Sequence, residues 1–377
     1  MGHKKNFLRN RQGFDLNALI FYIQTDATGG TSANDQFTIP VGTGTYNYNV
    51  ETSDGQSFTG QTTALTITFP SVGNYYISIT GTFPKIFFNN SGDDGKLIKV
   101  INFGTISYNT DITGAFYGCQ NLNELSALNG DYTFFNSALN GTSAIRSTSS
   151  LSTLSEGITF AALTNATSMF RLGELNSLPS TVTFANLTTG ARAFESCQLT
   201  SLPSGITLNK LANGQFFFLS NSLTDLPAGF RLDKIAGSSS GGSGMFNGST
   251  INTTRYSQLI RDLDTYNVNN TVGFGGGSSV HSKNQVDSGT TDGTTANKLV
   301  DSTQNFLTTV NIGDAVRNTT DSTWALVTNV DSDTQLTLGN DIMISGESYK
   351  IYDDATTKAR ANLEANRAWG MTDATTY

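Results

Sequence analysis

The chain has 377 residues, of which 14% are charged, and a formal net charge of -8, which provides no basic surface of the kind that nucleic acid requires. It has 38 Gly but 6 Pro, and its many Thr, Ser and Asn residues are typical of a β-rich protein with many turns. No apolar run reaches the about 20 residues that span a bilayer. We therefore expect a mainly β protein of several domains that neither binds nucleic acid nor inserts into a membrane.

Residues 1–34 begin with a basic leader that contains Lys4, Lys5, Arg9 and Arg11, followed by the strand-like stretch FDLNALIFYIQ. The apolar residues 16–23 are interrupted by Asn17 and lack a small-residue cleavage site, so we expect no classical secretory signal. Two interpretations stay open for this segment. It is either a solvated tail or a peptide that attaches the chain to a partner in a larger particle.

Residues 35–90 alternate apolar and polar side chains in the manner of antiparallel strands. Tyr46, Tyr48 and Val50 share one face of a predicted strand, Asp54-Gly55 is a hairpin turn, and a further strand is expected at 75–79. This pattern resembles the small immunoglobulin-like domain related to the polycystic-kidney-disease type. The resemblance implies a β-sandwich.

Residues 91–250 contain a repeat of 24 residues. Leu163, Leu187 and Leu211 are 24 apart, and five further columns of residues keep the same step. The predicted core columns contain Leu163, Phe170, Leu175, Leu178, Pro179, Leu187, Phe194, Leu199, Leu202, Pro203, Leu211, Phe218, Leu223, Leu226 and Pro227, and counting back one period adds Leu139. Because one short segment cannot bury its own apolar face, we expect successive coils to stack into a solenoid.

The stretches TNATSMFRLGELNSLPS and AFYGCQNLNELSAL resemble the BspA-type leucine-rich repeat, which occurs in bacterial surface proteins and phage tail proteins. Cys119 and Cys197 occupy equivalent places about three repeats apart. At roughly 4.8 Å per coil, their separation exceeds the reach of a disulfide. We therefore predict that both are buried free thiols.

Two separate segments, 251–285 and 354–377, are predicted to form one C-terminal cap. The first contains a helix around Tyr256 and Leu263, and the second contains a helix through Ala359 and Leu363. They resemble the cap that closes BspA-type solenoids. Residues 286–353 between them show their own strand pattern, predict a small β-barrel or sandwich, and resemble a module of phage virion proteins.

The sequence offers few candidates for chemistry. It has 2 His and 2 Cys and no metal-ligand spacing, so we predict no catalytic residue, metal or cofactor. Asp93-Asp94, Asp331/Asp333 and Asp353-Asp354 are paired acids. These acids are turn residues, calcium ligands or the carboxylates of a glycosidase, and the first interpretation is favoured because Asp is common in turns.

The resemblance implies a non-enzymatic structural appendage of a bacteriophage virion: a tail fibre, a head fibre or a receptor-binding protein. Its N-terminal segment would contact other virion proteins, and a homo-oligomer would adhere to a glycan or protein of the host surface through many weak contacts. The expected binding surface contains Arg171, Glu174, Arg192, Glu195, Gln198 and Asn221. A bacterial cell-surface adhesin of the same family and a glycan-degrading tailspike remain as alternatives.

Overall fold

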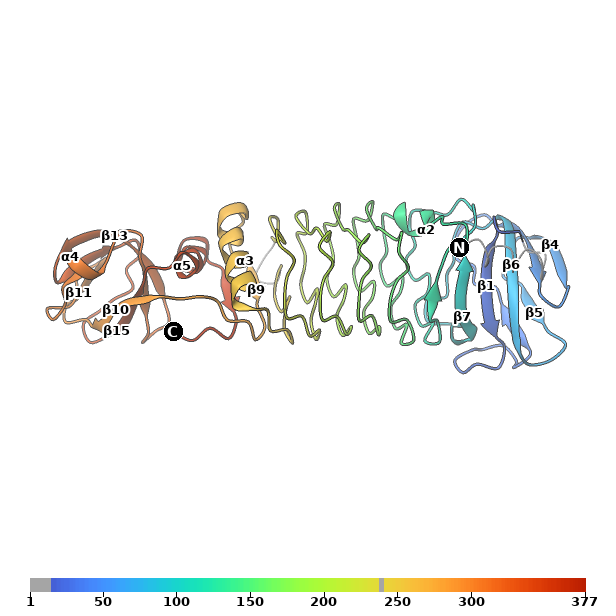
Figure 1. Ribbon diagram of the computed structural model, residues 1–377, viewed down its shortest axis with the longest axis horizontal. Coiled ribbons are helices and arrows are strands. Elements are labelled where there is room, and N and C mark those ends of the chain that lie inside the picture. Colours follow the sequence, from blue (N-terminus) through green and yellow to red (C-terminus); the bar gives the residue numbers. More distant parts are fainter. Residues whose placement is uncertain (1–14, 237–240) are drawn as a thin grey trace. The chain divides into compact units, whose positions relative to one another are not determined.

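The computed structural model describes residues 15–236 and 241–377, and the protein is mainly β, as the composition predicts (Figure 1). The chain divides into two compact units. Unit 1 comprises Met1–Leu208 and Phe216–Ser222, and unit 2 comprises Asn209–Gln215 and Leu223–Tyr377.

A six-stranded sheet forms the first part of unit 1 (Figure 1). Its strands lie in the order β4-β3-β6-β1-β7-β8. Their bounds are β1 (Leu19–Gln24), β3 (Asn47–Thr52), β4 (Ser57–Gln61), β6 (Asn74–Thr82), β7 (Leu97–Asn102) and β8 (Glu124–Leu125). A smaller sheet pairs β2 (Gln36–Thr38) with β5 (Thr66–Thr68), and a short 3-10 helix, η1 (Asp94–Lys96), precedes β7.

The alternation predicted for the first strands is present in this sheet. Tyr46, Tyr48 and Val50 are all buried, and β3 pairs with β4 through a turn in which Gly55 has φ +91°. A residue with a side chain is strained at that φ, which explains the Gly at this position. The strand expected at 75–79 is the central part of β6.

The sheet extends beyond both predicted domain boundaries. β1 pairs with β6 on one side and with β7 on the other, so residues 19–24 are a central strand and not part of a free attachment segment ending at residue 34. β7 and β8 belong to the same sheet, although both lie after the boundary predicted at residue 90. Strand pairing joins residues that are distant in sequence, and local alternation cannot reveal it.

From Asp111 onward, unit 1 consists of segments that lie side by side, and β8 belongs to the first of them. Parallel bridges join Asp111 to Asn140, Asn140 to Asn165 and Asn165 to Thr189, so the steps are 29, 25 and 24 residues. Every second N–H group from 166 to 172 donates to a carbonyl group of residues 189–195, at 2.8–2.9 Å. The longest step contains the short helix α2 (Thr133–Asn136). The backbone thus pairs continuously although the segments differ in length.

Most residues of the predicted core columns in unit 1 are buried between these segments. Phe170 stacks on Phe194 at 4.7 Å between ring centroids, and Phe160 stacks on Phe184 at 5.7 Å. The buried members are Leu163, Phe170, Leu175, Pro179, Leu187, Phe194, Leu199 and Phe218, whereas Leu178, Leu202 and Pro203 are partly exposed.

Leu139 does not belong to these columns. Its residue surface is 45% exposed, whereas Leu163 is fully buried. The step between Asn140 and Asn165 is 25 residues, so Ala138, which is buried, takes the place that a strict 24-residue count assigns to Leu139.

In unit 2, Leu211, Leu223 and Leu226 are buried and Pro227 is partly exposed. The helices α3 (Thr253–Tyr266) and α5 (Ala355–Arg367) pack against each other. β9 (Gly273–Gly275) pairs in parallel with β16 (Gly370–Thr372). The two segments that the sequence assigns to one cap are therefore adjacent in this unit.

The residues between them form an antiparallel sheet in the order β10-β15-β12-β13-β14-β11 (Figure 1). Its elements are β10 (Gln285–Thr290), β11 (Lys298–Val300), α4 (Phe306–Thr309), β12 (Ala315–Asn318), β13 (Trp324–Ser332), β14 (Gln335–Leu338) and β15 (Ser348–Tyr352). β12 begins at Ala315, and Ile312, which precedes it, is exposed. Trp324 and Tyr352 share an apolar cluster with Ala361 of α5, so the insert packs against the cap.

Among residues 15–236 and 241–377, no helix is long and apolar enough to cross a membrane.

Candidate functional site

The repeated segments of unit 1 share an uncommon backbone conformation near the predicted binding surface. Ser143 and Ser147 have φ of +53° and +57°, and Ser168 and Leu172 have φ of +54° and +58°. The same pair, four residues apart, recurs at Gly114 and Gly118, Arg192 and Ser196, and Phe216 and Ser220. Residues other than Gly rarely adopt this left-handed conformation. Its recurrence sets the register of the side chains between the two members of each pair.

Tyr117, Arg146, Arg171 and Glu195 occupy the same position in successive segments, each three residues after the first member of a pair. We call these four residues the arginine column. The backbone N–H one residue after Tyr117 donates to the carbonyl of Arg146, at 3.0 Å. The corresponding bonds to the carbonyls of Arg171 and Glu195 are both 2.9 Å. The column is therefore in register through four segments.

Glu195 joins two arginines. Arg171 donates to its carboxylate from Nε and Nη2 at 3.0 and 3.2 Å, and Arg192 donates from Nη1 at 2.8 Å. Burial raises the pKa of Glu195, but the hydrogen bonds from Arg192 and Arg171 outweigh it, and the pKa lies below its ordinary value. Arg192 also lies over the ring of Phe216, 4.7 Å from its centroid. These contacts hold the guanidinium groups of Arg171 and Arg192 in place.

Two residues predicted for the binding surface are buried. Glu195 is 7% exposed, and Asn221 is 2% exposed. The Asn221 side chain accepts from the N–H of Leu199 at 3.0 Å and donates to the carbonyl of Phe194 at 2.7 Å. Asn221 therefore bridges backbone groups inside unit 1, and it does not contribute to a surface.

Glu174 and Gln198 are at the surface and hydrogen-bond to each other across neighbouring segments. Arg171 and Arg192 are partly exposed. Four of the six predicted positions are thus available to a ligand.

The column contains two residues that the sequence analysis did not select, Tyr117 and Arg146. The guanidinium of Arg146 lies over the Tyr117 ring, 4.8 Å from its centroid. Counting 24 residues back from Arg171 gives Ser147, and only the true step of 25 gives Arg146. Tyr117 follows the pair AF, Arg171 follows MF and Glu195 follows AF. The similar pair AI precedes Arg146, which is a signal that would have corrected the count.

The predicted attachment residues Lys4, Lys5, Arg9 and Arg11 lie outside the described residues.

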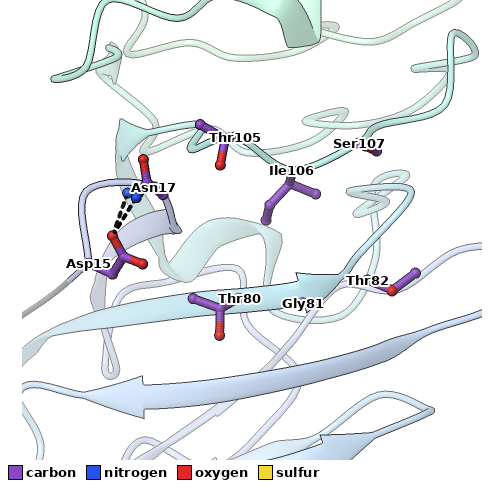
Figure 2. A pocket seen from close by; sticks show the side chains of 8 residues that line it. All are labelled: Asp15, Asn17, Thr80, Gly81, Thr82, Thr105, Ile106 and Ser107. Carbon is purple, nitrogen blue, oxygen red and sulfur yellow. Dashed lines mark hydrogen bonds between the residues drawn. The ribbon is translucent and has the colours of Figure 1, made fainter.

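A polar pocket of about 360 Å³ lies in unit 1 and is a second candidate (Figure 2). It is lined by Asp15, Asn17, Thr80, Gly81, Thr82, Thr105, Ile106 and Ser107. The carboxylate of Asp15 accepts from the backbone and side-chain N–H groups of Asn17, at 2.9 and 3.0 Å. The hydroxyl groups of the lining can hydrogen-bond to a polar ligand, whereas the hydrogen bonds of the Asp15 carboxylate are to Asn17.

The first acid pair supports local structure. Asp93 is buried and accepts from the backbone N–H groups of Ser32 and Thr38, at 3.0 and 2.6 Å. Burial raises the pKa of Asp94 to about 6, although a hydrogen bond from the N–H of Gly95 lowers it. The Asp93 carboxylate therefore connects the residue before η1 to residues 32–38, whereas the Asp94 carboxyl group bonds within η1.

Three of the four acids in the other two pairs also support local structure. Asp331 accepts from Nζ of Lys298 at 2.8 Å, and Asp353 accepts from the amide of Asn284 at 2.7 Å. Asp354 is the N-cap of α5 and accepts from two backbone N–H groups of its first turn, at 3.1 and 2.9 Å. Within residues 15–236 and 241–377, no three His, Cys, Asp or Glu side chains are grouped so that they could hold a metal ion.

Cys119 and Cys197 are buried and free, which confirms the prediction. Sγ of Cys197 donates to the carbonyl of Phe170 at 3.1 Å. Burial raises the pKa of both thiols, that of Cys197 to about 12. His281 is buried in unit 2, where its ring contacts the carbonyl of Ser282 and the hydroxyl of Tyr377.

Comparison of the chain with protein-family models, curated proteins and solved structures finds no match.

Proposed function

We propose that this protein is a structural appendage of a bacteriophage virion that adheres to the host surface. In this proposal the repeated segments form a BspA-type leucine-rich-repeat solenoid, which follows an immunoglobulin-like domain. The cap closes the solenoid and carries the small β insert. The protein acts as a tail fibre, a head fibre or a receptor-binding protein.

The observation that carries the proposal is the register of the repeated segments. Parallel backbone pairing keeps equivalent side chains one segment apart, with bridges at Asn140, Asn165 and Thr189. A ligand with repeating groups can contact such a row at several points, and each contact can be weak. Five of the six carboxyl groups of the three acid pairs accept hydrogen bonds in ion pairs, caps and loops, which favours adhesion over glycan cleavage; these five belong to Asp93, Asp94, Asp331, Asp353 and Asp354.

Two experiments test the proposal. Mass spectrometry of purified phage particles, from the phage whose genome encodes this chain, should detect the protein. The purified intact protein should also reduce adsorption of that phage to its host. A chain that is absent from the particles, and that is instead recovered from a bacterial cell surface, would favour the alternative of a bacterial adhesin.

A further inference from the structure

Arg146 is the member of the arginine column whose charge has no partner in residues 15–236 and 241–377. Among the described residues, its guanidinium has neither a hydrogen bond nor an ion pair, and its Nε is inaccessible to solvent. It lies over the ring of Tyr117, which holds the guanidinium plane without satisfying its N–H groups. Arg146 as a residue is partly exposed, so the two Nη groups of the same guanidinium, and not the buried Nε, are suited to an acceptor that arrives with a ligand.

The surroundings of Arg146 are more positive than the chain as a whole. Arg171 follows it in the column, and Arg192 lies one segment further on. Arg171 and Arg192 both form ion pairs with the single carboxylate of Glu195. This pairing leaves an excess of positive charge on the two arginines, on a chain whose net charge is -8. An anionic group is attracted to this face despite the overall negative charge.

Hydroxyl groups flank the unpaired guanidinium. Ser143 and Ser147 precede and follow Arg146, and both are partly exposed at the left-handed positions of their segment. A guanidinium binds a carboxylate through two parallel hydrogen bonds, and neighbouring serines can bond to alcohol groups on the same ligand. A sugar acid carries both kinds of group.

We propose that Arg146, together with Tyr117, Arg171 and the hydroxyls of Ser143 and Ser147, binds the carboxylates of an acidic polysaccharide. This inference rests on the proposed adhesive function and names the class of receptor. Arg146 is the group that contacts the carboxylate, Tyr117 positions it, and Arg171 provides a second cation one segment away. Successive sugar acids along a polymer would engage several copies of the protein at once.

The test measures binding of the intact protein to polygalacturonate by biolayer interferometry, with dextran as the neutral polymer. We expect binding to polygalacturonate that weakens as salt rises, and none to dextran. Arg146→Gln should weaken it about tenfold or more, because it removes a charge-assisted pair of hydrogen bonds. Arg255→Gln is the matched control, since Arg255 is a partly exposed arginine on α3 of unit 2. It should bind as the unmodified protein does.

A second variant keeps the test independent of any effect on folding. Ser147→Asp places a carboxylate beside Arg146, and Asp tolerates the left-handed conformation at this position. It should abolish binding while circular dichroism stays unchanged. The inference is overturned if the unmodified protein does not bind polygalacturonate, or if both variants bind as tightly as it does.

Single-stranded DNA distinguishes an acidic polysaccharide from polyanions in general. Equal affinity for DNA at the same salt, with the same dependence on Arg146, would overturn the polysaccharide assignment. If the protein is found in virions and blocks adsorption, yet polygalacturonate does not bind, the receptor class is wrong and the proposed function stands. If the protein is absent from virions but binds polygalacturonate, the proposed virion function is wrong and the assignment of the ligand class stands.

Discussion

Leu163 and Leu139 form a matched pair for testing the register of the core columns. They are 24 residues apart, so a count along the sequence treats them as equivalent. In the structure Leu163 is fully buried, whereas Leu139 is 45% exposed. Replacing each with Ala in the full chain therefore removes the same atoms from two different environments.

The two substitutions should differ in cost. Leu163→Ala removes about three buried carbon groups, each worth about 0.8 kcal/mol, and leaves a cavity, so we expect a loss of about 3 kcal/mol in the free energy of unfolding. Leu139 is already about half exposed, so Leu139→Ala loses roughly half of that transfer energy, and water can occupy the space that the side chain leaves. The expected loss is about 1 kcal/mol or less.

Unfolding should be followed by a probe that reports on unit 1. Both tryptophans, Trp324 and Trp369, belong to unit 2, so their fluorescence does not serve. Hydrogen exchange measured on peptides that cover residues 139–200 resolves the local loss of stability, with urea unfolding by circular dichroism beside it. Equal losses for the two variants would refute the 25-residue step between Asn140 and Asn165 as the register of the core, because they would place Leu139 inside it.

Three further predictions concern buried and capping groups. Cys119 and Cys197 should not react with a thiol reagent at about pH 8 in the folded protein, because burial raises the pKa of both thiols. Both thiols should react in urea. Fast reaction without denaturant would contradict their burial. Because burial raises the pKa of Asp94 to about 6, the folded state holds this proton more tightly than the unfolded state, and this group contributes a loss of stability as the pH rises from about 4 to about 6. Asp94→Asn should remove that contribution. Between about pH 4 and about pH 7, the urea midpoint of the variant should therefore fall less than that of the unmodified protein. An equal fall in the two proteins would contradict the raised pKa of Asp94. Asp354→Ala should cost about 1 kcal/mol of stability through loss of the α5 cap, whereas the neighbouring Asp353→Ala should cost less than about 0.5 kcal/mol, as measured by thermal unfolding of both variants.

Some of the structure follows from residues that are close in sequence. The alternation of Tyr46, Tyr48 and Val50 predicts their shared buried face, because successive side chains of a strand point to opposite sides. The spacing of Tyr256, Leu259 and Leu263 predicts the helix α3 for the corresponding reason. Both patterns need only the geometry of one element.

The candidate site could be predicted only in part. Arg171 and Arg192 were expected at the surface, and they are partly exposed there. Asn221 was expected beside them, although it stands 24 residues after Cys197, which was predicted to be buried. Its side chain serves the same interior position, where it bonds to backbone groups. Asparagine as a residue type indicated a surface position for Asn221. The 24-residue step from the buried Cys197 would have indicated an interior position.

Residues that are close in sequence are enough to predict that segments of about 24 residues repeat and that neighbouring segments cover their apolar columns, since no segment of that length can bury its own apolar face. The folded protein is needed to identify the equivalent residues where the segments are 25 or 29 residues long, and to place β1 and β8 in one sheet. Parallel pairing matches backbone N–H and carbonyl groups, and extra residues are accommodated in loops such as the one that contains α2. The register therefore follows the hydrogen bonds and not the residue count, and Arg146 comes to lie beside Tyr117 and Arg171 for that reason.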